Sequence, residues 1–173
     1  MVNGNDSNAN QPVAPELLGR LIDRHAATLE LFARQFCTCP EDVVQEALLE
    51  LARQPARPDD AAAWLYRVVR NKAISASRSA RRRQRHEAEA AGRRPRWFEP
   101  AAGNAIDAQI VTDALECLTI RDREVIVARV WGGLSFQQIG RLIGASDSTA
   151  HRRYQAALET LREKLRVPCP KTN

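Results

Sequence analysis

The residues with the most evident chemistry are hydrogen-bond donors in the last third of the chain. From Ser135 to about Leu161 the sequence predicts a short helix, a turn with glycine and a longer helix, which is the helix-turn-helix pattern. Such helix corners also occur in proteins that never bind DNA. Here the outward positions of the second helix carry side chains that donate to guanine or adenine edges, Ser148, His151, Arg152 and Gln155, and others that reach phosphates, Thr149 and Arg153. The pattern favours binding of duplex DNA.

A second candidate site lies on one helix in the first half of the chain. From Trp64 to Arg78, aromatic and basic residues interleave, and a polar stripe opposes an apolar one. Single-strand binders combine basic groups along a backbone with aromatic faces on which unstacked bases lie. The alternative is that Trp64 and Tyr66 are ordinary core aromatics. The polar stripe consists of Arg67, Arg70, Asn71, Ser75 and Arg78, and its apolar counterpart of Leu65, Val69, Ala73 and Ala76.

Charge is distributed unevenly along the chain. Residues 1–63 carry 10 acidic and 5 basic side chains, whereas residues 64–96 carry 11 basic and 2 acidic ones. A basic block of this density suits a polyanion, because each cation placed on a phosphate releases condensed counterions, although many charge runs are simply solvated. The acidic first third indicates a surface for a protein partner.

Catalytic and metal chemistry have little support in the sequence. Asp59 and Asp60 form an isolated pair, and no carboxylates or Cys and His residues gather at the spacing of a metal site or a triad. We therefore expect no enzyme, metal or cofactor, with a nuclease as the enzymatic alternative. The cysteines, Cys37, Cys39, Cys117 and Cys169, predict reduced thiols, with a sensor or metal role for the Cys-x-Cys pair as the alternative.

The elements that position these residues are predicted to be helices. A polar lead over residues 1–15 precedes helices over 16–36, 40–53 and about 60–85; residues 87–103 are an aperiodic linker, and residues 168–173 form a tail. Expected buried positions include Ile22 in the first helix and Leu165 in the last. The fold class is all-α, with two small helical domains, residues 16–86 and 104–167, joined by a flexible linker.

The length and composition agree with this architecture. A chain of 173 residues with 44% apolar and only 5% aromatic residues builds its core from Leu, Ile, Val and Ala. No apolar run approaches the roughly 20 residues that span a bilayer, and the first residues lack a signal peptide's apolar stretch. We expect a cytoplasmic protein without membrane insertion.

Four motifs occur in the order and at the spacing of one known family. They are DVVQEALLEL from Asp42, WLYRVVRNKAI from Trp64, REVIVARV from Arg123 with GLSFQQIG from Gly133, and IGASDSTAHRRYQAAL from Ile143. Over residues 16–166 the chain resembles bacterial RNA polymerase sigma factors of the extracytoplasmic-function class within the sigma-70 family. The two predicted domains resemble sigma region 2 and sigma region 4.

The resemblance implies roles for the three surfaces. It implies docking on the clamp helices of the largest subunit of core RNA polymerase, melting and holding of the minus-ten strand of promoter DNA, and reading of the minus-thirty-five duplex by His151, Arg152 and Gln155. An anti-sigma factor is a further implied partner. Candidate docking residues are Asp42, Gln45, Glu46 and Leu49, and candidate minus-ten residues are Trp64, Arg67, Arg70, Asn71 and Lys72.

Some positions depart from the family pattern. Ser75 stands where an Asp is common, and the pair His151-Arg152 replaces a basic residue followed by serine, so promoter preference does not carry over from relatives. The linker residues Arg93, Arg94, Arg96 and Trp97 match no assigned function. The alternative from another class is a helix-turn-helix regulator that acts without polymerase and binds duplex DNA by itself.

Overall fold

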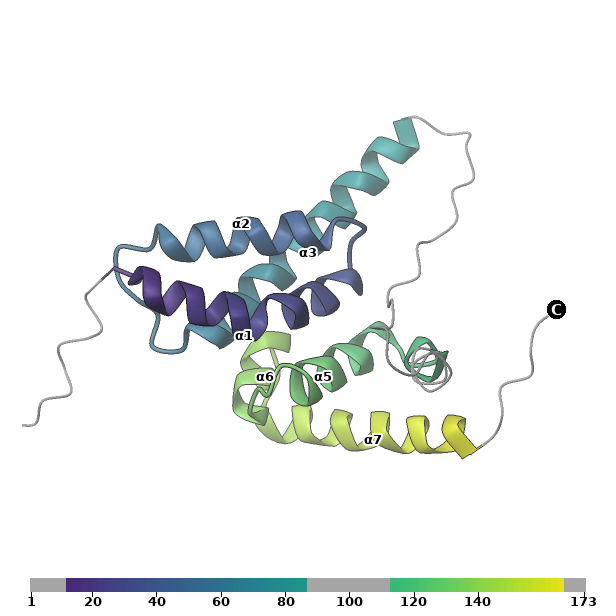
Figure 1. Ribbon diagram of the computed structural model, residues 1–173. Helices are drawn as coiled ribbons and strands as arrows, with labels where there is room; N and C mark the ends of the chain where they lie inside the picture. The colour runs from purple at the N-terminus through teal and green to yellow at the C-terminus, as the bar shows by residue number, and fades with distance from the viewer. Residues whose placement is uncertain (1–11, 87–112, 167–173) are drawn as a thin grey trace, which may run out of the picture. The chain divides into compact units, whose positions relative to one another are not determined.

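The chain forms two helical units. In the computed structural model, which describes residues 12–86 and 113–166, residue contacts divide it into Met1–Pro95 and Arg96–Asn173 (Figure 1). The described residues contain helices and turns and no strand, so the predicted all-α class with two helical domains is confirmed. The predicted linker 87–103, the tail 168–173 and most of the lead lie outside the described residues.

The first unit is built from α1 (Pro15–Arg34), α2 (Pro40–Ala52) and α3 (Ala61–His86). Both α1 and α2 begin with a proline, whose fixed φ and missing N–H suit the first position of a helix. Asp60 caps α3, because its carboxylate accepts a hydrogen bond from the N–H of Ala63 at 3.0 Å. The predicted first helix ends earlier than expected, so that Phe36 lies in the turn before α2 and packs edge-on against Phe32.

The core of this unit lies where the three helices meet. Its fully buried side chains come from all of them: Leu29, Phe32 and Ala33 from α1, Ala47 and Leu51 from α2, and Leu65, Tyr66, Val69 and Ala73 from α3. Tyr66 is therefore a core aromatic. The prediction that Ile22 is buried is wrong, because that side chain is 38% exposed. Beyond the core, the C-terminal part of α3 extends past α1 and α2 (Figure 1) and carries the exposed Arg81, Arg82 and Arg83.

The second unit contains α5 (Ile120–Val130), α6 (Phe136–Ile143) and α7 (Asp147–Arg166), preceded by a helical turn over residues 113–116. Each helix begins with a side-chain cap: Thr119 for α5, Ser135 with Gln138 as a capping box for α6, and Ser146 for α7. On α7, Ala150 and Ala157 are buried, but Leu165 is 52% exposed and the prediction that it is buried is wrong.

Two glycines shape the corner between α6 and α7. Gly144 ends α6 in the left-handed conformation with φ 68°, which glycine adopts without steric cost. Gly140 lies where α6 meets the following turn, and a Cβ atom on it would approach the carbonyl oxygen of Ala145 to 2.8 Å. Close approach of helix and turn therefore requires glycine at position 140.

Gly140→Ala tests this packing requirement. The added methyl meets backbone atoms, which cannot rotate away, so we expect a loss of about 1–3 kcal/mol in stability of the second unit. Native-state hydrogen exchange of the α6 and α7 amides measures this local stability. Gly19→Ala is the matched control, because no atom lies within 4 Å of its Cβ and alanine favours a helix interior by about 0.5–1 kcal/mol. Unchanged exchange in Gly140→Ala would contradict the packing argument.

Candidate nucleic-acid and protein interfaces

The first candidate surface is the outward face of α7 near its N-terminus. Because an α-helix turns about 100° per residue, Ser148, His151, Arg152 and Gln155 share an arc, and all four are exposed. Thr149 and Arg153 lie to one side of this arc and are partly buried. The structure therefore brings together the four side chains predicted to meet base edges, on a face that packing leaves open.

His151 is held by its neighbours on this face. Its ring lies edge-on against Phe136 of α6, with centroids 4.8 Å apart, and its Nε2 lies 3.3 Å from Nε2 of Gln155. The guanidinium of Arg129 lies over the same Phe136 ring at 4.7 Å and donates to the carbonyl of Leu134 at 2.8 Å. Phe136 thus connects the reading face to α5 through ring and cation–π contacts. Sequence spacing gave no signal of this supporting role.

Hydroxyl groups at the start of α7 are engaged in capping. The Ser146 hydroxyl accepts from the N–H of Thr149 at 3.2 Å and lies 2.9 Å from the Thr149 hydroxyl. The Ser148 hydroxyl lies 3.0 Å from the Ser146 hydroxyl. These contacts fix the first turn of the helix, from which Thr149 is predicted to reach phosphate.

The second candidate surface is the face of α3 opposite its buried stripe. Arg67, Asn71 and Ser75 are exposed, while Trp64 and Arg70 are half-buried. Trp64 is half-buried, whereas Tyr66 is fully buried. Aromatic, amide and cationic groups therefore lie together on one side of α3, as single-strand binding requires.

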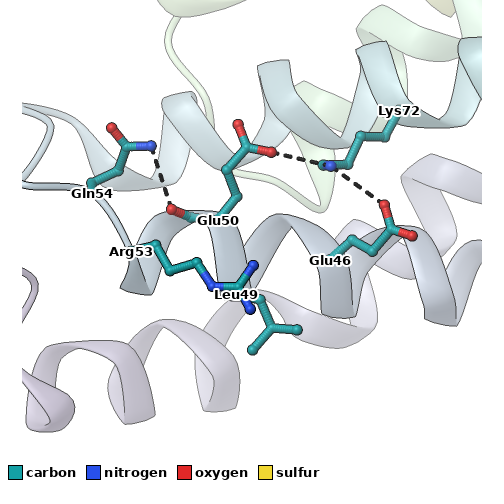
Figure 2. A pocket seen from close by; sticks show the side chains of 6 residues that line it. All are labelled: Glu46, Leu49, Glu50, Arg53, Gln54 and Lys72. Atoms are coloured by element: carbon teal, nitrogen blue, oxygen red, sulfur yellow. Dashed lines mark hydrogen bonds and ion pairs between the residues drawn. The ribbon is translucent and has the colours of Figure 1, made fainter.

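Lys72 does not lie with this group. Its side chain lies at the border with α2, where it pairs with carboxylates of that helix. Its Nζ is 3.3 Å from Oε2 of Glu46 and 3.1 Å from Oε2 of Glu50 (Figure 2). The hydrogen-bonded carboxylates of Glu50 and Glu46 raise the pKa of Lys72. The structure thus joins a predicted minus-ten residue to a predicted docking residue.

The third candidate surface is the exposed face of α2. Asp42, Gln45, Glu46 and Leu49 all point outward, and Leu49 is 46% exposed. An exposed leucine among acidic and amide side chains favours a partner that offers both apolar and basic groups. Next to this face is a pocket of about 300 Å³ (Figure 2), lined by Glu46, Leu49, Glu50, Arg53, Gln54 and Lys72.

Two lining residues of this pocket, Glu50 and Arg53, carry no functional prediction from the sequence. A signal for Glu50 existed, because it lies four residues after Glu46 and such residues share a helix face. The family resemblance places Gln54 in the segment before α3 that is expected to help melt and hold the minus-ten strand. The amide of Gln54 donates to the carbonyl of Glu50 at 3.4 Å, which places its side chain back along α2. The ion pairs of Lys72 with Glu46 and Glu50 depend on the packing of α2 against α3, so the sequence contains no local signal for them.

The cysteine pair lies in the turn between α1 and α2. Both thiols are partly buried, and that of Cys37 donates to the carbonyl of Ala33 at 3.5 Å. Burial raises the pKa of Cys37 to about 11, so this thiol is protonated at neutral pH. Among the residues that the structure describes, no group of three or more His, Cys, Asp or Glu is placed to hold a metal ion, and no helix is long and apolar enough to cross a membrane.

Family models match both units. The one described as Sigma-70 region 2 matches residues 21–83, and the one described as Sigma-70, region 4 matches residues 108–161. The chain is 35% identical to the ECF RNA polymerase sigma factor SigL of Mycobacterium tuberculosis H37Rv, over 84% of this chain and 87% of the relative. It is 31% identical to the RNA polymerase sigma factor CarQ of Myxococcus xanthus, with the same coverage.

Solved structures show the same architecture. The sigma factor RpoE, crystallised with the anti-sigma factor NepR from Bartonella quintana, is similar with a TM-score of 0.70 and 25% identity, covering 90% of this chain and 99% of that one. CnrH, in complex with the cytosolic domain of CnrY, is similar with a TM-score of 0.58 and 25% identity, covering 88% and 90%.

Phe136→Leu tests whether Phe136 positions His151. An aromatic ring 4.8 Å away and edge-on perturbs the chemical shifts of the imidazole protons, and leucine removes that ring current while keeping an apolar side chain. We expect the His151 ring protons to shift towards random-coil values in proton NMR spectra. His25 is the internal control, because it lies against Tyr66 in the other unit. Unaltered His151 signals would mean that Phe136 does not hold the ring.

Proposed function

The chain belongs to the sigma-70 family as an RNA polymerase sigma factor of the extracytoplasmic-function class, and on this basis we propose how its surfaces divide the work of transcription initiation. The face of α2 binds the clamp helices of the largest subunit of core RNA polymerase. The open face of α3 holds the non-template strand of the minus-ten element, and the start of α7 reads the minus-thirty-five duplex.

The observation that supports this division is the separation of the polar faces on helices of the two family regions. Residues 21–83 carry an acidic face with an exposed leucine on α2 and an aromatic and basic face on α3. Residues 108–161 carry the arc of base-edge donors on α7. Each face offers the chemistry that its proposed partner needs: opposite charge and apolar contact for protein, stacking for unpaired bases, and donors for the major groove.

Catalysis in this scheme belongs to the polymerase. We propose that this chain is a binding and specificity subunit that acts in the cytoplasm, where its polymerase partner works. Reading of the duplex positions the complex, and capture of unstacked bases offsets the few kcal/mol that unstacking each step costs. The two solved relatives support an anti-sigma factor as an additional partner, since RpoE is bound to NepR and CnrH to the cytosolic domain of CnrY.

Titration into core RNA polymerase that lacks sigma tests the proposal. Native mass spectrometry should show a complex with one copy of this chain. We expect Leu49→Arg to weaken the complex at least tenfold, since it places a cation and a bulky group in the proposed apolar contact. Leu165→Arg, on α7, replaces another exposed leucine and should bind as the unmodified protein does.

The alternative, a helix-turn-helix regulator that acts without polymerase, predicts the opposite pattern. The protein alone would bind duplex DNA specifically, and no complex with core polymerase would form. Those two results together would overturn the proposed function.

Arg152→Ala and Asn71→Ala test the division between duplex reading and strand capture. Arg152→Ala should weaken promoter binding by about 1–3 kcal/mol if its contact is bidentate to a guanine. Asn71→Ala should leave initial promoter binding unchanged and slow opening. Footprinting measures promoter binding, and the permanganate reactivity of unpaired thymines measures promoter opening. The promoter for both assays is identified first, by transcribing genomic fragments with the reconstituted complex.

Arg162→Ala is the matched control, because Arg162 is an exposed arginine on α7 outside the reading arc. It should behave as the unmodified protein in both measurements. The same defect in Arg152→Ala and Asn71→Ala would show that the two faces do not divide the work in this way.

A further inference from the structure

Lys72 lies between two surfaces that the proposed function gives to different partners. Its ammonium bridges Glu46 and Glu50 of the docking helix, at 3.3 and 3.1 Å (Figure 2). Its backbone, however, belongs to α3, directly after Asn71 on the strand-binding helix. A cation on the proposed strand-binding helix is therefore held by two carboxylates of the proposed docking helix.

This bridge can exchange its partners. The side chains of Glu46 and Glu50 are 64% and 44% exposed, and that of Lys72 is 28% exposed, so water and other ions reach the contact. Ion pairs in such surroundings are weak, because solvent screens them. Lysine carries its point charge on a flexible four-carbon stem, so its ammonium can move to another anion without any movement of α3.

We propose that Lys72 exchanges ion partners when the sigma factor docks: an arginine of the core polymerase takes Glu46 and Glu50, and the released ammonium of Lys72 binds a phosphate of the non-template strand. This inference rests on the proposed function, since it needs both the docking face of α2 and the strand face of α3.

The chemistry of the pocket favours an arginine as the incoming group. The charged residues that line it are Glu46, Glu50, Arg53 and Lys72, whose formal charges cancel while Lys72 is in place. Departure of Lys72 leaves a net charge of −1 in the pocket. One incoming cation brings the net charge back to zero. A planar guanidinium engages carboxylates through a fork of N–H donors, whereas lysine offers a compact point charge. The exposed side chain of Leu49 lines the pocket and offers an apolar surface against which the methylene groups of the arginine can pack.

The exchange couples the two binding events. In the free protein, Lys72 is occupied and the strand surface lacks one cation. Docking supplies the missing cation, so the bound polymerase raises the affinity for the strand, and by linkage the bound strand raises the affinity for polymerase. We therefore expect the free protein to bind single-stranded DNA weakly.

The test uses the free 173-residue chain and a fluorescein-labelled oligothymidylate, with fluorescence anisotropy measured over a range of salt concentrations. Glu46→Gln with Glu50→Gln removes both partners of Lys72, so we expect tighter binding and a slope of log K against log salt that is steeper by about 0.7, the value for one further phosphate contact on a single strand. Adding Lys72→Met to this pair should abolish the increase in slope.

The control separates release of Lys72 from loss of negative charge. Glu16→Gln with Asp23→Asn also removes two exposed acids, on α1, and neither contacts Lys72 in the structure. This pair should change the affinity for the oligothymidylate only through the net charge of the protein. The slope of log K against log salt should be the same whether position 72 is Lys or Met. Thermal unfolding followed by circular dichroism checks that every variant is folded.

Two results would overturn the exchange. One is an equal gain in slope for Glu46→Gln with Glu50→Gln whether position 72 is Lys or Met, and the other is no gain in slope at all. The core titration, performed separately, distinguishes this failure from that of the proposed function. If the unmodified protein forms the complex with core polymerase while the variants give either result, the proposed function holds and the exchange does not. If the complex forms, we also expect Glu46→Gln with Glu50→Gln to weaken it, and unchanged core affinity would overturn the arginine partner.

Discussion

Burial of one face of α3 determines which side chains of the first unit are available to partners. Leu65, Tyr66, Val69 and Ala73 are fully buried against α1 and α2. A rotation of α3 that turned this face outward would expose its apolar side chains and bury its arginines. Both changes are unfavourable, and burial of an unpaired charge is the more costly of the two. The polar face with Arg67 and Asn71 is therefore fixed towards solvent. The same constraint places Lys72 at the border, within reach of α2 and its carboxylates.

The second unit meets a comparable constraint at the corner between α6 and α7. The helix and the following turn approach so closely at Gly140 that a side chain has no room, and Gly144 turns the chain in a conformation that other residues rarely adopt. With the corner fixed, Phe136 lies against the His151 ring, and the reading arc of α7 stays exposed. Each unit thus presents its polar face because packing occupies the opposite one.

Much of this arrangement could be predicted from the sequence, because it depends on local signals. The capping residues Thr119, Ser135 and Ser146 mark the starts of α5, α6 and α7, and apolar periodicity identifies the outward residues of α2. Contacts between helices could not be predicted in this way. Nothing in the sequence pairs Lys72 with Glu50 or Phe136 with His151. Nor does apolar periodicity distinguish the exposed Ile22 and Leu165 from the buried residues of α1 and α7.

Site-specific photocrosslinking in the reconstituted promoter complex tests the division of surfaces most directly. A photoreactive amino acid would replace Leu49 on α2, Asn71 on α3 or Gln155 on α7, one position at a time. The account predicts crosslinks from position 49 to the largest polymerase subunit, from position 71 to the unpaired non-template strand and from position 155 to the upstream duplex. Crosslinks from position 49 to DNA, or from positions 71 and 155 to the same DNA segment, would contradict it.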